Sequence, residues 1–181
     1  TMILTAFAVV REKENGTMEQ LMVTPVSKFG LMMGKLVPFF VIGAIETCLV
    51  LAMMRFVFQV PIHGSLPLLA LFTVPFLFTS LGLGLFVSTV ASSQVQAIQI
   101  AFLIILPSVL LSGFIFPQET MPLPIYIIGQ VIPLTFFMRI LRGIIIRGAG
   151  FWDLWDQAAI LLGFGILLLT TSALRFQKTV T

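Results

Sequence analysis

The stretch that decides the fold is Pro67–Val90, PLLALFTVPFLFTSLGLGLFVSTV, which contains no charged residue. A helix needs about 20 mostly apolar residues to cross the hydrocarbon core of a bilayer. A second uncharged stretch, Ile98–Phe116, follows it. Both are continuously apolar, whereas the strands of a membrane barrel alternate apolar and polar residues. A spanning helix also satisfies its own backbone hydrogen bonds, so these stretches indicate an all-α membrane protein.

The composition of the whole chain agrees with this fold class. Only 9% of the residues are charged and the mean hydropathy is +1.13, whereas soluble domains have about 25% charged residues. The single cysteine, Cys48, excludes a disulfide framework. The net charge of +3 is small and no dense basic run is present, so we expect no nucleic-acid partner.

Two further spans and the end of another complete the expected bundle. Residues 36–57 carry only Glu46 and Arg55 as charges, and residues 153–174 are apolar if Asp156 lies at the interface. Residues 1–10 are apolar but too short to span, and we expect them to be the end of a span that begins earlier in a longer protein. The prediction is about four full spans, at 36–57, 67–90, 98–116 and 153–174.

The charged residues gather in one segment. Seven of the seventeen Asp, Glu, Lys and Arg residues lie between Arg11 and Lys35. Lys and Arg concentrate on the cytoplasmic side of membrane proteins, and the tail is basic too, so we expect both segments in the cytoplasm. Arg139, Arg142 and Arg147 argue against this orientation, but an even number of spans joins the two basic ends.

Within residues 11–35, the sequence predicts a short capped helix. Gly16 is expected to end the preceding helix, Thr17 and Gln20 have the spacing of a capping box, and Pro25 is expected to end the new helix. Two alternatives stay open at this point. The helix is either a docking element or an ordinary amphipathic helix in a loop.

Residues 117–152 form an irregular outer segment. Pro122, Pro124 and Pro133 interrupt apolar pieces that are too short to span, which predicts short helices that enter the outer leaflet and return. A pair of amphipathic helices lying flat is the alternative. The basic residues of this segment are expected either to contact lipid phosphates or an anionic substrate, or to anchor the segment at the headgroups. They are Arg139, Arg142 and Arg147.

Three stretches together resemble the permeases of ABC-2 type transporters. Residues 11–27, REKENGTMEQLMVTPVS, are similar to the signature R-E-x-E-x-G-T-x-E-Q-L-x-x-T-P-[VI]-S of that family. Residues 112–117, SGFIFP, followed by Met121-Pro122, resemble its S-G-F-x-[FY]-P…M-P element. Residues 133–135, PLT, followed by Arg142-Gly143-Ile144, resemble its P-x-[TS]…R-G-[IV] element. Phe136 stands where many relatives carry Tyr or His.

The resemblance implies that residues 11–35 form the cytoplasmic coupling segment, whose helix docks on a separate ATPase. Its implied contact residues are Glu12, Glu14, Gly16, Thr17, Glu19, Gln20, Leu21, Thr24 and Pro25. The carboxylates would pair with basic groups of the ATPase. No G-x-x-x-x-G-K-[ST] loop is present in the sequence, so ATP and Mg²⁺ are expected on the ATPase and not on this chain.

The resemblance further implies a non-catalytic subunit of an exporter in the bacterial inner membrane, paired with an identical or different permease subunit. Glu46 lies in the middle of a predicted span. It is either part of the substrate path or a neutral group that joins two helices by a hydrogen bond. An ion-coupled secondary transporter is the alternative function, although we find one midplane acid and no obvious repeat.

Overall fold

The computed structural model describes residues 1–15 and 28–178, and every regular element in these two ranges is helical. The α-helices are α1 (Met2–Glu14), α3 (Lys28–Phe56), α4 (Leu66–Val90), α5 (Gln94–Leu111), α6 (Leu123–Gln130), α7 (Pro133–Arg147) and α8 (Phe151–Lys178), with a short 3-10 turn, η1, at Gln118–Thr120. Four of them are long and apolar enough to cross a membrane, at Gly34–Phe56, Leu66–Val90, Gln94–Leu111 and Phe151–Arg175. The predicted all-α membrane fold is confirmed.

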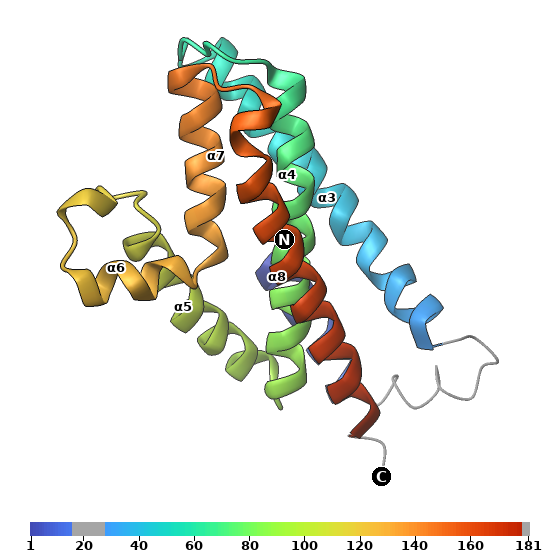
Figure 1. Cartoon of the computed structure of the whole chain (residues 1–181). Helices are drawn as coiled ribbons and strands as arrows, with labels where there is room; N and C mark the ends of the chain where they lie inside the picture. The colour runs from blue at the N-terminus through green and yellow to red at the C-terminus, as the bar shows by residue number, and fades with distance from the viewer. Residues whose placement is uncertain (16–27, 179–181) are drawn as a thin grey trace.

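Helices α4 and α8 form the centre of the bundle and run side by side (Figure 1). Their backbones approach closely because Gly82 and Gly165 carry no side chain where they meet. A Cβ at Gly165 would lie 3.3 Å from the backbone nitrogen of Thr79. The Thr79 hydroxyl donates a hydrogen bond to the Leu161 carbonyl across the interface, at 2.7 Å. Small residues allow this kind of close packing in membranes.

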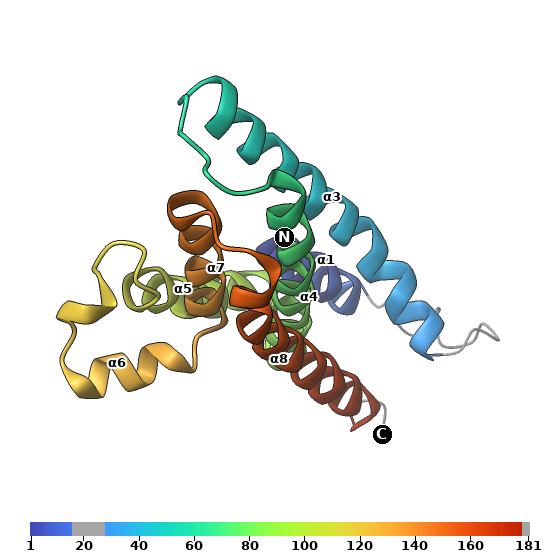
Figure 2. The same ribbon diagram turned by 45° about the horizontal axis from the view of Figure 1, so that its top comes forward.

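Helix α1 lies against α4, with α3 and α5 on either side (Figure 2). The contact depends on Gly84, where a Cβ would lie 2.7 Å from the Met2 carbonyl oxygen and 2.8 Å from Thr5 Cβ. Buried Val9 and Val10 fill the space around it. The first ten residues therefore belong to the bundle as a well-packed helix.

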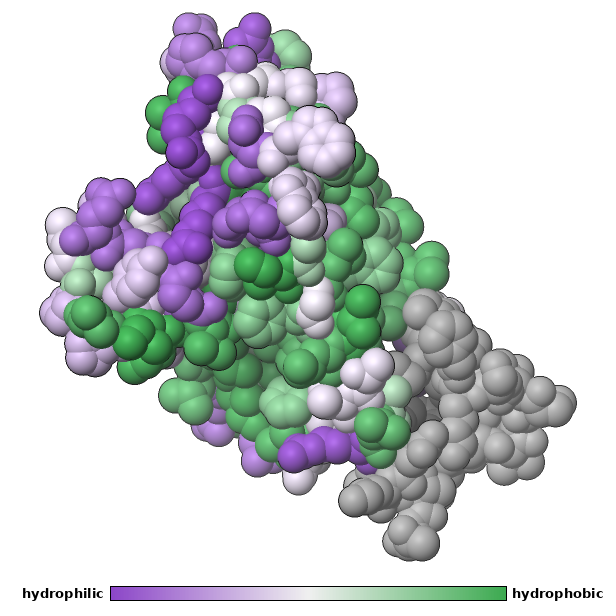
Figure 3. Space-filling view, in the orientation of Figure 1, coloured by the Kyte–Doolittle hydropathy of each residue, from purple (hydrophilic) through white to green (hydrophobic). Residues whose placement is uncertain are grey.

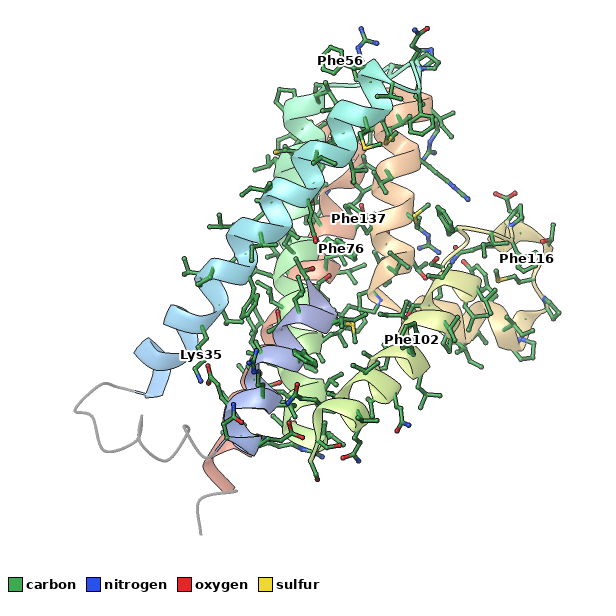
Figure 4. The ribbon with its side chains drawn as sticks, turned by 180° about the vertical axis from the view of Figure 1, so that it is seen from behind. Lys35, Phe56, Phe76, Phe102, Phe116 and Phe137 are labelled. Atoms are coloured by element: carbon green, nitrogen blue, oxygen red, sulfur yellow. The ribbon has the colours of Figure 1, made fainter. Side chains whose placement is uncertain are left out.

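Helix α7 packs along one side of α4 and α8 (Figure 1). The buried residues Ile140 and Ile144 join a core with residues of α4 and α8. Phe137 stacks on Phe76 of α4 with the ring centroids 4.1 Å apart, as the two labelled rings of Figure 4 show. The helix ends at Gly148, whose φ of +62° suits glycine at a helix C-terminus.

Helices α6 and α7 meet at an angle of 90°. Pro133 is the first residue of α7, and Pro122 directly precedes α6, so the breaks predicted at these two prolines are confirmed. Pro124 lies in the first turn of α6, and the break predicted there is wrong. α6 extends sideways from the bundle (Figure 2), while α7 is packed within it. By length and composition this bent pair fits a broken span or a re-entrant loop, and both the re-entrant segment and the flat pair stay predictions.

Helix α5 differs from its predicted range of 98–116 at both ends. It begins at Gln94, because the Ser93 side chain accepts a hydrogen bond from the Gln96 backbone and caps the helix. It ends at Leu111, because Gly113 has a φ of +87° that does not continue a helix. Residues 112–117 instead form the start of the link between α5 and α6.

Candidate functional site

Most of the predicted coupling residues lie outside the described residues. These are Gly16, Thr17, Glu19, Gln20, Leu21, Thr24 and Pro25, and their docking role stays a prediction. The described structure reaches this segment from both sides. α1 ends at Glu14, and α3 begins at Lys28.

Three consecutive side chains at the end of α1 contact three different helices. Glu12 forms an ion pair with Lys35 of α3. The Lys13 ammonium donates a hydrogen bond to the Ser88 carbonyl of α4, at 2.5 Å. Glu14 binds Gln94, as described below. We call Glu12, Lys13 and Glu14 the α1 charge triplet.

Glu14 holds the first residue of α5 by two hydrogen bonds. One carboxylate oxygen accepts from the Gln94 backbone N–H at 3.0 Å, and the other accepts from the Gln94 side-chain amide. The first turn of a helix has backbone N–H groups without partners and a partial positive charge. A carboxylate there satisfies a donor and is electrostatically favourable, so Glu14 fixes the start of α5 against the end of α1.

Lys13 does the corresponding work at the end of α4. Ser88 lies in the last turn of α4, where carbonyl groups lack helical donors and the partial charge is negative. Burial lowers the pKa of the Lys13 ammonium below its usual value. Figure 4 shows Lys35 at the α3 end that faces the last turn of α1. The triplet thus ties one helix end to three others.

Glu12 and Glu14, predicted to pair with a partner, therefore have partners within the chain. Their pairing with an ATPase stays a prediction. The roles of Lys13, Ser88 and Gln94 were not predicted from the sequence. No local pattern signals them, since Ser88 lies 75 residues from Lys13 and Gln94 lies 80 residues from Glu14.

A second site lies apart from the α1 charge triplet, between α7 and the link from α5 to α6. It is a pocket of about 370 Å³, which we call the outer pocket. Its lining residues are Ser112, Gln118, Glu119, Met138, Arg139, Arg142, Ile146 and Arg147. Figure 3 shows hydrophilic residues gathered over this part of the molecule, above a mostly hydrophobic face. The three arginines predicted as one group are brought together here.

Two of the arginines hold the link in place. Arg139 donates hydrogen bonds to the side-chain carbonyls of Gln118 and Gln130, at 2.9 and 2.8 Å. Arg142 donates to the Gly113 carbonyl. The guanidinium of Arg139 also lies over the Phe136 ring, 5.6 Å from its centroid. Phe136 is buried in the apolar core, so this position packs and does not supply a polar group.

The arginines of the outer pocket outnumber its acidic groups. Among residues 1–15 and 28–178, none of the three forms an ion pair with a carboxylate, although Glu119 lines the same pocket. Three arginines and one glutamate give the lining a formal charge of +2. The pocket is therefore suited to an anion.

Glu46 does not line the outer pocket. Its side chain is 56% exposed on α3, and its carboxylate lies 3.6 Å from the amino group of Thr1. Its place in a substrate path stays a prediction. In the described part of the chain, no group of three or more His, Cys, Asp or Glu side chains is arranged to hold a metal ion.

Comparisons with known proteins agree with the resemblance read from the sequence. The family model described as "ABC-2 family transporter protein" matches residues 1–174. The "Inner membrane transport permease YhhJ" of Escherichia coli strain K12 is 37% identical over 98% of this chain and 48% of its own length. The "Probable multidrug ABC transporter permease YbhS" of the same strain is 35% identical over 96% of this chain and 44% of its own length.

A more distant relative is the "ABC transporter G family member 20" of Dictyostelium discoideum, which is 25% identical over 97% of this chain and 24% of its own length. No solved structure matches the chain. The chain spans about half the length of the two bacterial relatives. From the family match over nearly all of its residues, the chain belongs to the ABC-2 family of transporter proteins.

Proposed function

We propose that this chain is the transmembrane part of a permease subunit in an ATP-driven exporter of the bacterial inner membrane. A separate ATPase subunit would bind and hydrolyse ATP with Mg²⁺, and a second permease subunit would complete the pathway. Membership of the ABC-2 family supports this proposal. So do the names of the bacterial relatives, one as an inner membrane transport permease and one as a probable multidrug permease.

The observation that carries the proposal is the α1 charge triplet. The predicted docking helix at residues 17–24 follows it directly, and the triplet contacts α3, α4 and α5 through Lys35, Ser88 and Gln94. A displacement of the docking helix would therefore reach the ends of three spans at once. This is the connection that ATP-driven transport needs, because the force arises in a different subunit.

The test separates docking from transmission. The full-length protein, co-expressed with its ATPase, is purified from membranes as wild type and two variants. The docking variant carries Glu19→Ala and Leu21→Ala. The transmission variant carries Lys13→Ala, because Lys13 binds Ser88 of α4 and is not among the residues predicted to contact the ATPase. Arg55→Ala is the matched control, since it also removes a basic side chain but lies in the last turn of α3.

We expect the docking variant to lose the co-purified ATPase activity. The transmission variant should retain the ATPase subunit and its hydrolysis but lose ATP-driven substrate accumulation in vesicles, and the control should behave as wild type. If no ATPase co-purifies with the wild-type protein from intact membranes, the proposal is overturned and the ion-coupled alternative is favoured. Full transport by the docking variant would refute the assigned docking residues.

A further inference from the structure

We propose that the outer pocket binds the phosphate group of an anionic phospholipid from the outer leaflet, with the acyl chains lying along the apolar surface beside the α5–α6 link. The juxtaposition that carries this inference is a positively charged pocket beside an exposed apolar segment of the link. It is independent of the ATPase and of the transported substrate.

The outer pocket is positively charged and has hydrogen-bond donors to offer. Arginine carries five N–H donors in a planar arrangement that fits phosphate oxygens. In the outer pocket, Arg139 uses part of this capacity on Gln118 and Gln130, and Arg142 uses part on the Gly113 carbonyl. No hydrogen bond to the Arg147 side chain occurs within residues 1–15 and 28–178. Donors therefore remain available, and the +2 lining favours an anion.

The arginines of the outer pocket lie beside the membrane spans. Arg142 and Arg147 are exposed and project from α7, a helix packed alongside the spans α4 and α8 (Figure 1). Arginines on a helix that packs alongside membrane spans require a partner or contact with the headgroups. A lipid phosphate supplies two or more acceptor oxygens at that depth. Free anions from water would satisfy the charge but would not cover the neighbouring apolar surface.

The link between α5 and α6 has an exposed apolar surface next to the pocket residues in the sequence. Phe114, Ile115 and Phe116 lie two to four residues before the pocket residue Gln118 and are 61%, 52% and 56% exposed. Figure 4 shows Phe116 on the outer side of the link, away from the bundle. A cationic pocket beside an exposed apolar segment of the link matches a molecule with a charged head and a hydrocarbon tail. An anionic phospholipid has this chemistry.

The test uses the full-length protein in its purified complex. Native mass spectrometry measures binding of phosphatidylglycerol and of phosphatidylcholine to the wild type, to an Arg142→Gln Arg147→Gln double variant and to an Arg55→Gln control. Arg55 is an exposed arginine in the last turn of α3 and does not line the outer pocket. The control therefore removes one arginine charge outside the site.

We expect preferential binding of phosphatidylglycerol, weakened about tenfold or more by the double variant because hydrogen bonds between charged groups are lost, and unchanged by Arg55→Gln. Equal binding of both lipids, an unaffected double variant, or full displacement of the lipid by millimolar inorganic phosphate would overturn the proposal. The last result would identify a site for small anions.

A second measurement needs no variant. A phosphatidylglycerol analogue with a photoreactive headgroup is crosslinked to the wild-type protein in nanodiscs, and the labelled peptides are mapped. Labelling within residues 112–119 or 138–147 supports the proposal. Labelling confined to other segments contradicts it, even if the double variant fails to fold.

Discussion

The two charged regions of this molecule are organised in opposite ways. At the end of α1, acidic and basic side chains bind one another and the ends of neighbouring helices, as in the Glu12–Lys35 ion pair and the Lys13–Ser88 hydrogen bond. In the outer pocket, three arginines meet without a carboxylate partner in the described part of the chain. The difference teaches that charge near a membrane serves two purposes. One arrangement joins helices, and the other is suited to a ligand from outside the chain.

The largest effect should come from separating the α1 charge triplet from its partners. Gly84→Ala would place a Cβ 2.7 Å from the Met2 carbonyl oxygen, so α1 must move away from α4. We expect a loss of about 1–3 kcal/mol in stability, as is typical of overpacking, measured as a lower melting temperature in detergent. Gly163→Ala is the control, because nothing lies within 4 Å of that Cβ. A stable Gly84→Ala protein would show that the contact is looser than described.

A smaller effect is expected from removing one member of the triplet. Glu14→Ala leaves the Gln94 backbone N–H without its acceptor. Loss of an N-terminal helix cap costs about 0.5–2 kcal/mol, which thermal unfolding monitored by circular dichroism can detect. Ser93 still caps the next donor, at Gln96, so α5 itself should form. Unfolding at the wild-type temperature would contradict the capping role.

The ion pair allows a charge-exchange test of the joining role. Glu12→Lys should destabilise the protein by about 0.2–1 kcal/mol, the usual worth of partly exposed pairs, since the side chains of Lys35 and Glu12 are 19% and 36% exposed. The double variant Glu12→Lys Lys35→Glu should recover most of the loss. Recovery is measured by thermal unfolding at low and high salt, and the absence of recovery would show that other contacts of these residues dominate.

The smallest effect on folding is expected in the outer pocket. Arg147→Gln removes a charge for which the described residues supply no carboxylate, so stability should change by no more than about 0.5 kcal/mol. The measurement is thermal unfolding in detergent without added anionic lipid. A large loss would place Arg147 among the residues that hold the fold, and the contrast between the two regions would disappear.

The spans were predictable because each is a local pattern of apolar residues. The uncharged stretch predicted at residues 67–90 is α4, Leu66–Val90, and Pro122 and Pro133 correctly marked the breaks around α6. The end of α5 was predicted too late, at 116. Hydropathy continues past Leu111, but the positive φ of Gly113 ends the helix.

The candidate sites were only partly predictable. The spacing of Arg139 and Arg142 predicts a shared helix face, whereas the place of Arg147 in the same pocket was not predicted from its spacing. Gln118 and Gln130, which bind Arg139, were not expected, because the bend between α6 and α7 brings them there. The partners of Glu12 and Glu14 also depend on how distant helices pack. Sequence patterns describe single helices well, and the contacts between helices require the fold.

Each of the three helices joined by the α1 charge triplet contains an internal proline. α3 contains Pro38, α4 contains Pro75 and α5 contains Pro107, whereas α8 contains none. A proline removes one hydrogen bond from a helix and makes bending easier at that point. The joined helices therefore each have a built-in hinge. A displacement at their ends would bend each of them at its proline, whereas α8 contains no proline at which to bend.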